Sequence, residues 1–140
     1  RGILEDAGTA PPQRLRRLVQ VFIRSECEEA EVRTALNDAA PLYRDAPESH
    51  AVKAAGERAF RRFMKEALPE APDALRARAG GLLLSTLSAA GKDFSERPRR
   101  PAEIEAYAAA MGDMFCAYLQ SLAAPGDGPP RSARRVTLAR

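Results

Sequence analysis

Apolar residues along most of this chain recur every three or four positions, the spacing that gathers them on one face of an α-helix. In the stretch from about residue 12 to 29, they are Leu15, Leu18, Val19, Phe22, Ile23 and Cys27. No segment shows the apolar–polar alternation of a half-buried β-strand. The pattern therefore predicts an all-α protein.

Five stretches of this kind predict five helices, over about residues 12–29, 31–40, 48–68, 73–94 and 102–123. Prolines stand at or just before four of the starts, where the missing N–H costs no intrahelical hydrogen bond. These prolines are Pro12, Pro47, Pro72 and Pro101. We expect the helices to pack as an antiparallel bundle.

The last two predicted helices carry more apolar surface than one subunit can bury. Residues 80–91 are apolar all round, and the apolar set between Ile104 and Leu122 is wider than one stripe. A helix without a polar face is buried on more than one side, which indicates a second subunit. Gly80 and Gly81 would each cost about 1 kcal/mol relative to alanine in an exposed helix. We expect another backbone to approach them closely, and a local kink is the alternative.

Composition and charge place the chain among ordinary single-domain proteins. It has 140 residues, of which 45% are hydrophobic and 29% charged. The net charge of +3 comes from residues 125–140, which contain four arginines and one aspartate. The neutral body lacks the basic face of a nucleic-acid-binding domain. We expect the tail to lack regular structure, as a solvated terminus or as a weak tether to an acidic partner.

Residues 1–8 look like the end of a helix that begins elsewhere, since the chain starts at Arg1 without a methionine. We therefore expect a fragment of a longer protein, with its main domain over residues 9–124. No apolar run approaches the roughly 18 residues of a membrane span, and no signal peptide is visible. A soluble, cytoplasmic protein without membrane contact is expected.

The residues that carry catalysis or bind metals do not cluster in this sequence. His50 is the single histidine, and the two cysteines, Cys27 and Cys116, fall within helical apolar patterns that favour core positions. The acidic run from Glu26 to Glu31 lacks the histidines of a di-metal site in a bundle. Ser85 and Ser88 have no nearby candidate base. We predict no catalytic residue, no metal and no cofactor.

Three stretches resemble the C-terminal effector-binding and dimerisation domain of TetR-family transcriptional regulators. LRRLVQVFIRSE resembles that domain's first helix, and VRTALNDAAPLYRDAPE with AFRRFMKEALP is similar to its central helices. ALRARAGGLLLSTLSAAGKDF and IEAYAAAMGDMFCAYL are similar to its final pair. The resemblance covers about residues 15–122. The family's N-terminal helix-turn-helix has no counterpart here, so operator DNA would be bound only by residues outside this chain.

The resemblance implies a homodimer and a small-molecule effector. The last two helices would form a four-helix interface with their symmetry mates, using Gly81, Leu82, Ser85, Ile104, Ala108, Met111, Phe115 and Tyr118. An apolar or amphipathic effector would lie among the first four helices, lined by Phe22, Leu36, Tyr43, Phe60, Met64, Leu84 and Leu87. For each lining residue, ordinary core packing is the alternative.

Two other functions remain open from the sequence. A helical dimerisation or adaptor module without a small-molecule site would explain the last two helices equally well. A small helical enzyme is disfavoured by the lack of a catalytic cluster.

Overall fold

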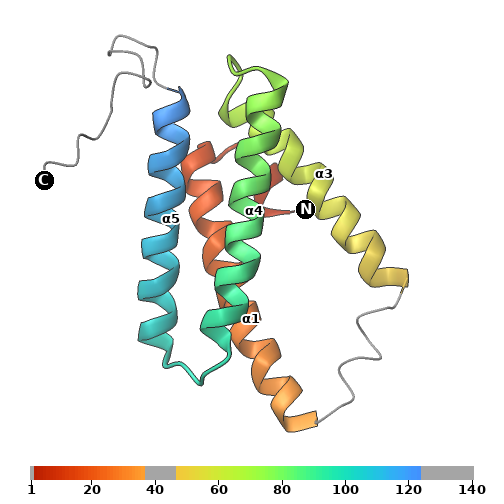
Figure 1. The fold of residues 1–140 in the computed structure, drawn as a ribbon, viewed down its shortest axis with the longest axis vertical. Coiled ribbons are helices and arrows are strands. Elements are labelled where there is room, and N and C mark those ends of the chain that lie inside the picture. Colours follow the sequence, from red (N-terminus) through yellow and green to blue (C-terminus); the bar gives the residue numbers. More distant parts are fainter. Residues whose placement is uncertain (1, 37–46, 124–140) are drawn as a thin grey trace, which may run out of the picture.

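The computed structural model describes residues 2–36 and 47–123, apart from the side chains of residues 36, 47–50 and 52. This part contains a short 3-10 helix η1 (Ile3–Glu5) and the helices α1 (Pro11–Leu36), α3 (Pro47–Ala67), α4 (Asp73–Ser95) and α5 (Pro101–Ala123). No strand occurs in these residues, so the all-α prediction is confirmed for them. Helix α1 contacts each of the other elements, and α4 and α5 lie against it (Figure 1).

Prolines mark the helix starts, as predicted. Helices α1, α3 and α5 begin at a proline, and α4 begins directly after Pro72. The carbonyl of the preceding residue accepts the first backbone hydrogen bond, as when Arg100 O accepts from the N–H of Ile104. The predicted bounds of α3, α4 and α5 are confirmed to within one residue.

The predicted break after Glu29 is wrong, because α1 continues without interruption to Leu36. The periodic apolar pattern stops near Cys27, but no proline or glycine follows before residue 37. Glutamate, alanine and arginine keep the helix favourable after it leaves the core. Val32, within the predicted second helix, is 54% exposed. The rest of that predicted helix, residues 37–40, lies outside the described residues.

The core forms where α1, α3, α4 and α5 meet. Leu15, Val19 and Ile23 of α1 are almost completely buried, and so are Phe63 and Met64 of α3. Each such side chain contributes roughly 1.5–3 kcal/mol by leaving water. The buried residues of α3 all belong to its last two turns, whereas its described side chains between 51 and 58 are exposed or half-buried.

Two glycines allow α4 and α5 to approach α1 closely. A Cβ added at Gly91 of α4 would lie 2.9 Å from Cε1 of Phe22 and 3.3 Å from Cγ of Glu26. A Cβ added at Gly112 of α5 would lie 3.3 Å from Cγ of Arg16 and 3.6 Å from its Cα. A larger residue at either position would therefore require the neighbouring side chains or helices to shift.

The cysteines lie where the apolar pattern predicted. Cys27 is buried in the core, and the half-buried Cys116 donates an S–H···O bond to the carbonyl of Pro12 at 3.5 Å. Burial raises the pKa of both thiols.

Helix α4 is apolar on more than one side, as predicted. Leu83 and Leu87 are buried, while Leu82, the residue before Leu83, is 53% exposed. None of the described helices nevertheless combines the length and apolar content that crossing a bilayer requires.

Candidate ligand-binding site

An open groove of about 520 Å³ runs between α3 and α4. Its apolar lining consists of Phe60, Met64, Ala77, Gly80, Gly81 and Leu84. Its charged lining consists of Glu57, Arg61 and Lys65 on α3 with Asp73 and Arg76 on α4. Small-molecule sites have volumes of roughly 300–1,000 Å³ and the same combination of apolar surface with a few polar groups.

The two glycines of α4 have different roles in this groove. A Cβ added at Gly80 would lie 3.3 Å from Cγ of Met64 and 3.5 Å from Cε1 of Phe60, so this glycine lets α3 pack closely. A Cβ added at Gly81 would meet nothing within 4 Å, so this glycine leaves the groove open. Within this chain the atoms nearest to an added Cβ include no other backbone at either position, and close approach by the backbone of a second subunit stays a prediction. At Gly80 the neighbours are side chains of α3.

The end of the groove at the α3–α4 turn contains an ion pair between two residues of α4. Near the α3–α4 turn, Arg76 forms an ion pair with Asp73 and donates a hydrogen bond to the carbonyl of Leu68 at 3.2 Å. The hydrogen bond from Arg76 lowers the pKa of Asp73, and the charge of Lys65 lowers it further. Arg61 and Lys65 have no ion-pair partner within the described residues.

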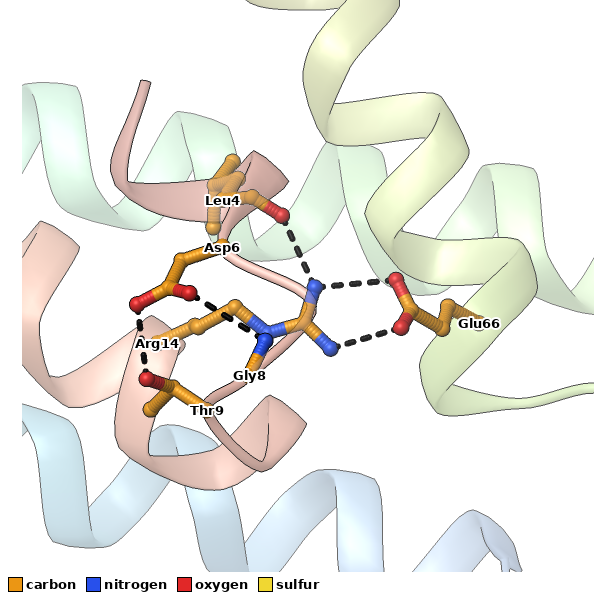
Figure 2. A network of polar contacts seen from close by, with 6 residues as sticks. All are labelled: Leu4, Asp6, Gly8, Thr9, Arg14 and Glu66. Carbon is orange, nitrogen blue, oxygen red and sulfur yellow. Dashed lines mark hydrogen bonds and ion pairs between the residues drawn. The ribbon is translucent and has the colours of Figure 1, made fainter. Parts of the chain in front are cut away.

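The α3 wall of the groove is attached to the start of the chain through Arg14 of α1 (Figure 2). The Arg14 guanidinium donates to both carboxylate oxygens of Glu66, at 2.9 and 2.7 Å, and to the carbonyl of Leu4, at 2.9 Å. The Arg14 side chain is only 2% exposed. Its Cζ lies 5.7 Å from the ring centroid of Phe63.

Arg14 and Glu66 each stabilise the charged form of the other. The hydrogen bonds from Arg14 lower the pKa of Glu66, and those bonds raise the pKa of Arg14 in turn. Nε of Arg14 is the one buried side-chain nitrogen or oxygen of the described residues without a hydrogen-bond partner. Sequence reasoning missed both residues, because Arg14 falls just outside the apolar stripe of α1 and reads as part of a solvated face.

Beside this network, a turn at residues 6–9 leads the chain from η1 into α1. Asp6 accepts hydrogen bonds from the backbone N–H of Gly8 at 3.2 Å and from Oγ1 of Thr9 at 2.7 Å (Figure 2). These bonds lower the pKa of Asp6 and hold the chain in the turn that leads from η1 to α1.

The predicted ligand-lining residues are divided among several places. Phe60, Met64 and Leu84 line the groove. Leu87 is buried in the core, where it is 3% exposed. Half-buried Phe22 lines a separate, more polar hollow of about 650 Å³ between α1 and α4. The side chain of Leu36 and all of Tyr43 lie outside the described residues. The charged groove residues were not predicted.

The predicted dimer residues differ in how exposed they are within this chain. Leu82 and Ser85 are exposed on α4, and Gly81 is exposed but lines the groove. Ile104 and Tyr118 are half-buried against the core. Ala108, Met111 and Phe115 are buried within this single chain, at 2%, 6% and 3% exposure, so they present little surface to a second subunit. Their place in a dimer interface stays a prediction. Met114, which was not chosen, is 53% exposed.

The sequence of this chain matches that of a known protein family. A sequence profile of the tetracyclin repressor-like C-terminal domain matches residues 10–122, which span α1 to α5. The chain belongs to this family. The resemblance seen in the sequence over residues 15–122 is thereby confirmed. No curated protein matches the chain.

Family membership makes this a domain of the kind that binds effectors and dimerises in regulators. Within the described part of the chain, no group of three or more histidine, cysteine, aspartate or glutamate side chains is placed to hold a metal ion. The α3–α4 groove, with its apolar lining and charged residues, is the candidate site of this tetracyclin repressor-like domain.

Proposed function

We propose that this chain is the ligand-sensing and dimerisation domain of a TetR-like transcriptional regulator. A small apolar or amphipathic effector binds between α3 and α4 and modulates DNA binding by an N-terminal helix-turn-helix that precedes residue 1 in the complete protein. Residues 1–8 continue the connection to that DNA-binding domain. The chain acts by binding rather than by catalysis.

The observation that carries the proposal is the open apolar groove in a member of this family. Phe60 and Met64 present aromatic and thioether groups to it, and such side chains adapt to varied apolar ligands. Because Gly81 has no side chain, it leaves open space in the groove that a larger residue would occupy.

Dimerisation is supported by the outward faces of α4 and α5. Leu82 and Met114 are the large exposed apolar residues of these helices, and they lie equally far along the chain from the connector between them. Exposed small residues surround them in the sequence, namely Ser85, Ala89, Ala110 and Ala117. A two-fold symmetric dimer uses the same surface of both subunits, so each exposed apolar residue would be buried twice in the interface.

Sensing follows from a difference in affinity. A ligand that binds one separation of α3 and α4 better than another shifts the domain towards that separation. Glu66 lies next to Lys65 of the groove and is bonded through Arg14 to the carbonyl of Leu4. A displacement of α3 therefore acts on the segment that leads towards the DNA-binding domain.

Ligand binding is tested by NMR on the isotopically labelled chain with a panel of apolar and amphipathic small molecules. We expect saturable shift changes concentrated at Phe60, Met64, Gly81 and Leu84, accompanied by a rise in Tm. Binding confined to other surfaces, or none with any compound, would refute the sensing function. A stable dimer in that case would favour the adaptor function.

A further inference from the structure

We infer that the effector of the α3–α4 groove is a small amphipathic anion, with a carboxylate head at the end near the α3–α4 turn and an apolar body extending towards Leu84. This inference rests on the proposed function and specifies its ligand. The order of charges along the groove, the extent of its apolar lining and the open space at Gly81 all favour such a ligand.

The charges of α3 are ordered along the groove. Glu57, Arg61 and Lys65 line it at intervals of four residues, so they follow one another on successive turns of one helix face. The acid lies farthest from the α3–α4 turn and Lys65 lies nearest to it. On α4, Asp73 and Arg76 neutralise each other at the turn end. Arg61 and Lys65 therefore leave an excess of positive charge between Glu57 and the turn.

The apolar lining extends away from that positive end. The contacts of Gly80 with Met64 and Phe60 place these residues at the same level of the two helices. From Ala77 to Leu84, the lining of α4 covers two turns, or about 10 Å. A straight chain of about eight carbons spans such a length.

These features favour one class of head group over others. A carboxylate supplies a counter-charge to Arg61 and Lys65, whereas an ammonium group would meet them with like charge. Interactions between exposed opposite charges contribute about 0.2–1 kcal/mol each, which corresponds to a factor of roughly 1.4–5 in Kd for each cation. The two cations together predict a preference of roughly tenfold for the carboxylate over a neutral head of equal chain length.

The experiment compares three probes of one chain length, octanoate, octanol and octylamine, on the full chain by NMR titration at low and high salt. We expect octanoate to bind with the lowest Kd, octanol to bind more weakly and octylamine to bind weakest. We expect added salt to remove most of the difference between octanoate and octanol, because it screens exposed charges.

Substitutions at Lys65 and Arg61 then test whether these side chains bind the carboxylate head. Lys65→Gln and Arg61→Gln should each weaken octanoate binding and leave octanol binding unchanged. Arg62→Gln is the matched control, because Arg62 is exposed on α3 but does not line the groove. Equal losses for octanol in the groove variants, or equal losses of octanoate in the control, would contradict the assignment.

A groove-filling variant tests the site itself. Gly81→Leu places a side chain in the open space and should abolish octanoate binding without preventing folding, which a circular dichroism melt verifies. Gly56→Leu is its control, since Gly56 is also an exposed helical glycine with nothing within 4 Å of an added Cβ.

The outcomes separate this inference from the proposed function. If octanol or octylamine binds the groove at least as tightly as octanoate, the anionic effector is wrong but the sensing function stands. If none of the three probes binds there, the anionic effector is refuted, and the broader ligand panel decides the sensing function. If Gly81→Leu binds octanoate as the wild type does, the groove is not the site.

Discussion

Arg14 of α1 holds both carboxylate oxygens of Glu66 on α3, 52 residues further along the chain. The guanidinium is buried, and the Glu66 side chain is 51% exposed. A charge in that position depends on its partner, because an unpaired buried cation is strongly unfavourable. The pair therefore fixes the last turns of α3 against α1.

Replacing Glu66 with glutamine should destabilise the domain, because it leaves the buried guanidinium without a counter-charge. We expect a lower Tm and a lower midpoint in urea than for Glu70→Gln, an exposed glutamate in the α3–α4 turn. Arg14→Met with Glu66→Leu should recover part of the loss, since an apolar pair often replaces a buried ion pair at little cost. A Glu66→Gln variant as stable as the control would contradict this account.

Because of this ion pair, we expect the folded domain to lose stability at acid pH. The pKa of Glu66 in the folded chain is lowered by Arg14, so the unfolded chain binds protons more readily. The contribution of the pair is complete above the unfolded pKa of about 4.3 and is lost as the pH falls through the lower folded pKa. The difference in urea midpoint between wild type and Glu66→Gln should be constant near neutral pH and shrink below about pH 4. A difference that grows on acidification would have the wrong sign.

Alanine at Gly91 should destabilise the domain even though alanine favours helices. The added Cβ would lie 2.9 Å from the ring of Phe22, and overpacking costs about 1–3 kcal/mol. The gain in helix propensity of about 1 kcal/mol offsets part of this cost. Gly56→Ala has no such contact and should stabilise by up to about 1 kcal/mol. Urea denaturation measures both, and a more stable Gly91→Ala variant would mean that the helices separate easily.

Self-association should depend on the outward face of α4 and α5. Leu82→Asp and Met114→Asp should each weaken the dimer at least about tenfold, which corresponds to about 1.4 kcal/mol. Val21→Asp is the matched control, since Val21 is a 40% exposed apolar residue of α1. Sedimentation velocity over a concentration series makes the measurement. A wild-type chain that stays monomeric and folded throughout the series would remove the basis for this interface.

The connector between α4 and α5 should depend on Arg99. Its Cζ lies 4.2 Å from the ring centroid of Phe94, and its Nε donates to the carbonyl of Phe94 at 2.9 Å. Tyr107 stacks on the same ring with centroids 4.0 Å apart. Arg99→Lys loses the planar contact and the directed bond, so we expect a loss of about 1 kcal/mol. Arg97→Lys, an exposed arginine of the same connector, should leave the thermal melt unchanged.

Helix positions were predictable where two local signals coincide. Proline at the start and a regular apolar stripe after it located α3, α4 and α5 closely. The end of α1 was not predictable from the stripe, because residues beyond Cys27 keep a helical backbone without burying a face. Backbone preference and burial are separate quantities, and periodicity reports only burial.

Which side of a wide apolar helix faces inwards was not predictable either. On α5 the apolar residues nearly surround the axis. Gly112 lies against Arg16 of α1, and Met111 and Phe115 are buried while Met114 is exposed. The groove shows the same limit. Phe60, Met64 and Leu84 were chosen as apolar residues, but the position of Arg61 and Lys65 beside them depends on how α3 meets α4.

Helix α3 is held at one end. Its core contacts and its bond to Arg14 all belong to the turns from Phe60 onwards, while the described side chains before it bury little. A helix of 21 residues is about 31 Å long. Because only this end of α3 is held, a ligand in the groove that tilts the helix by a few degrees displaces the opposite end several times farther than the residues it contacts.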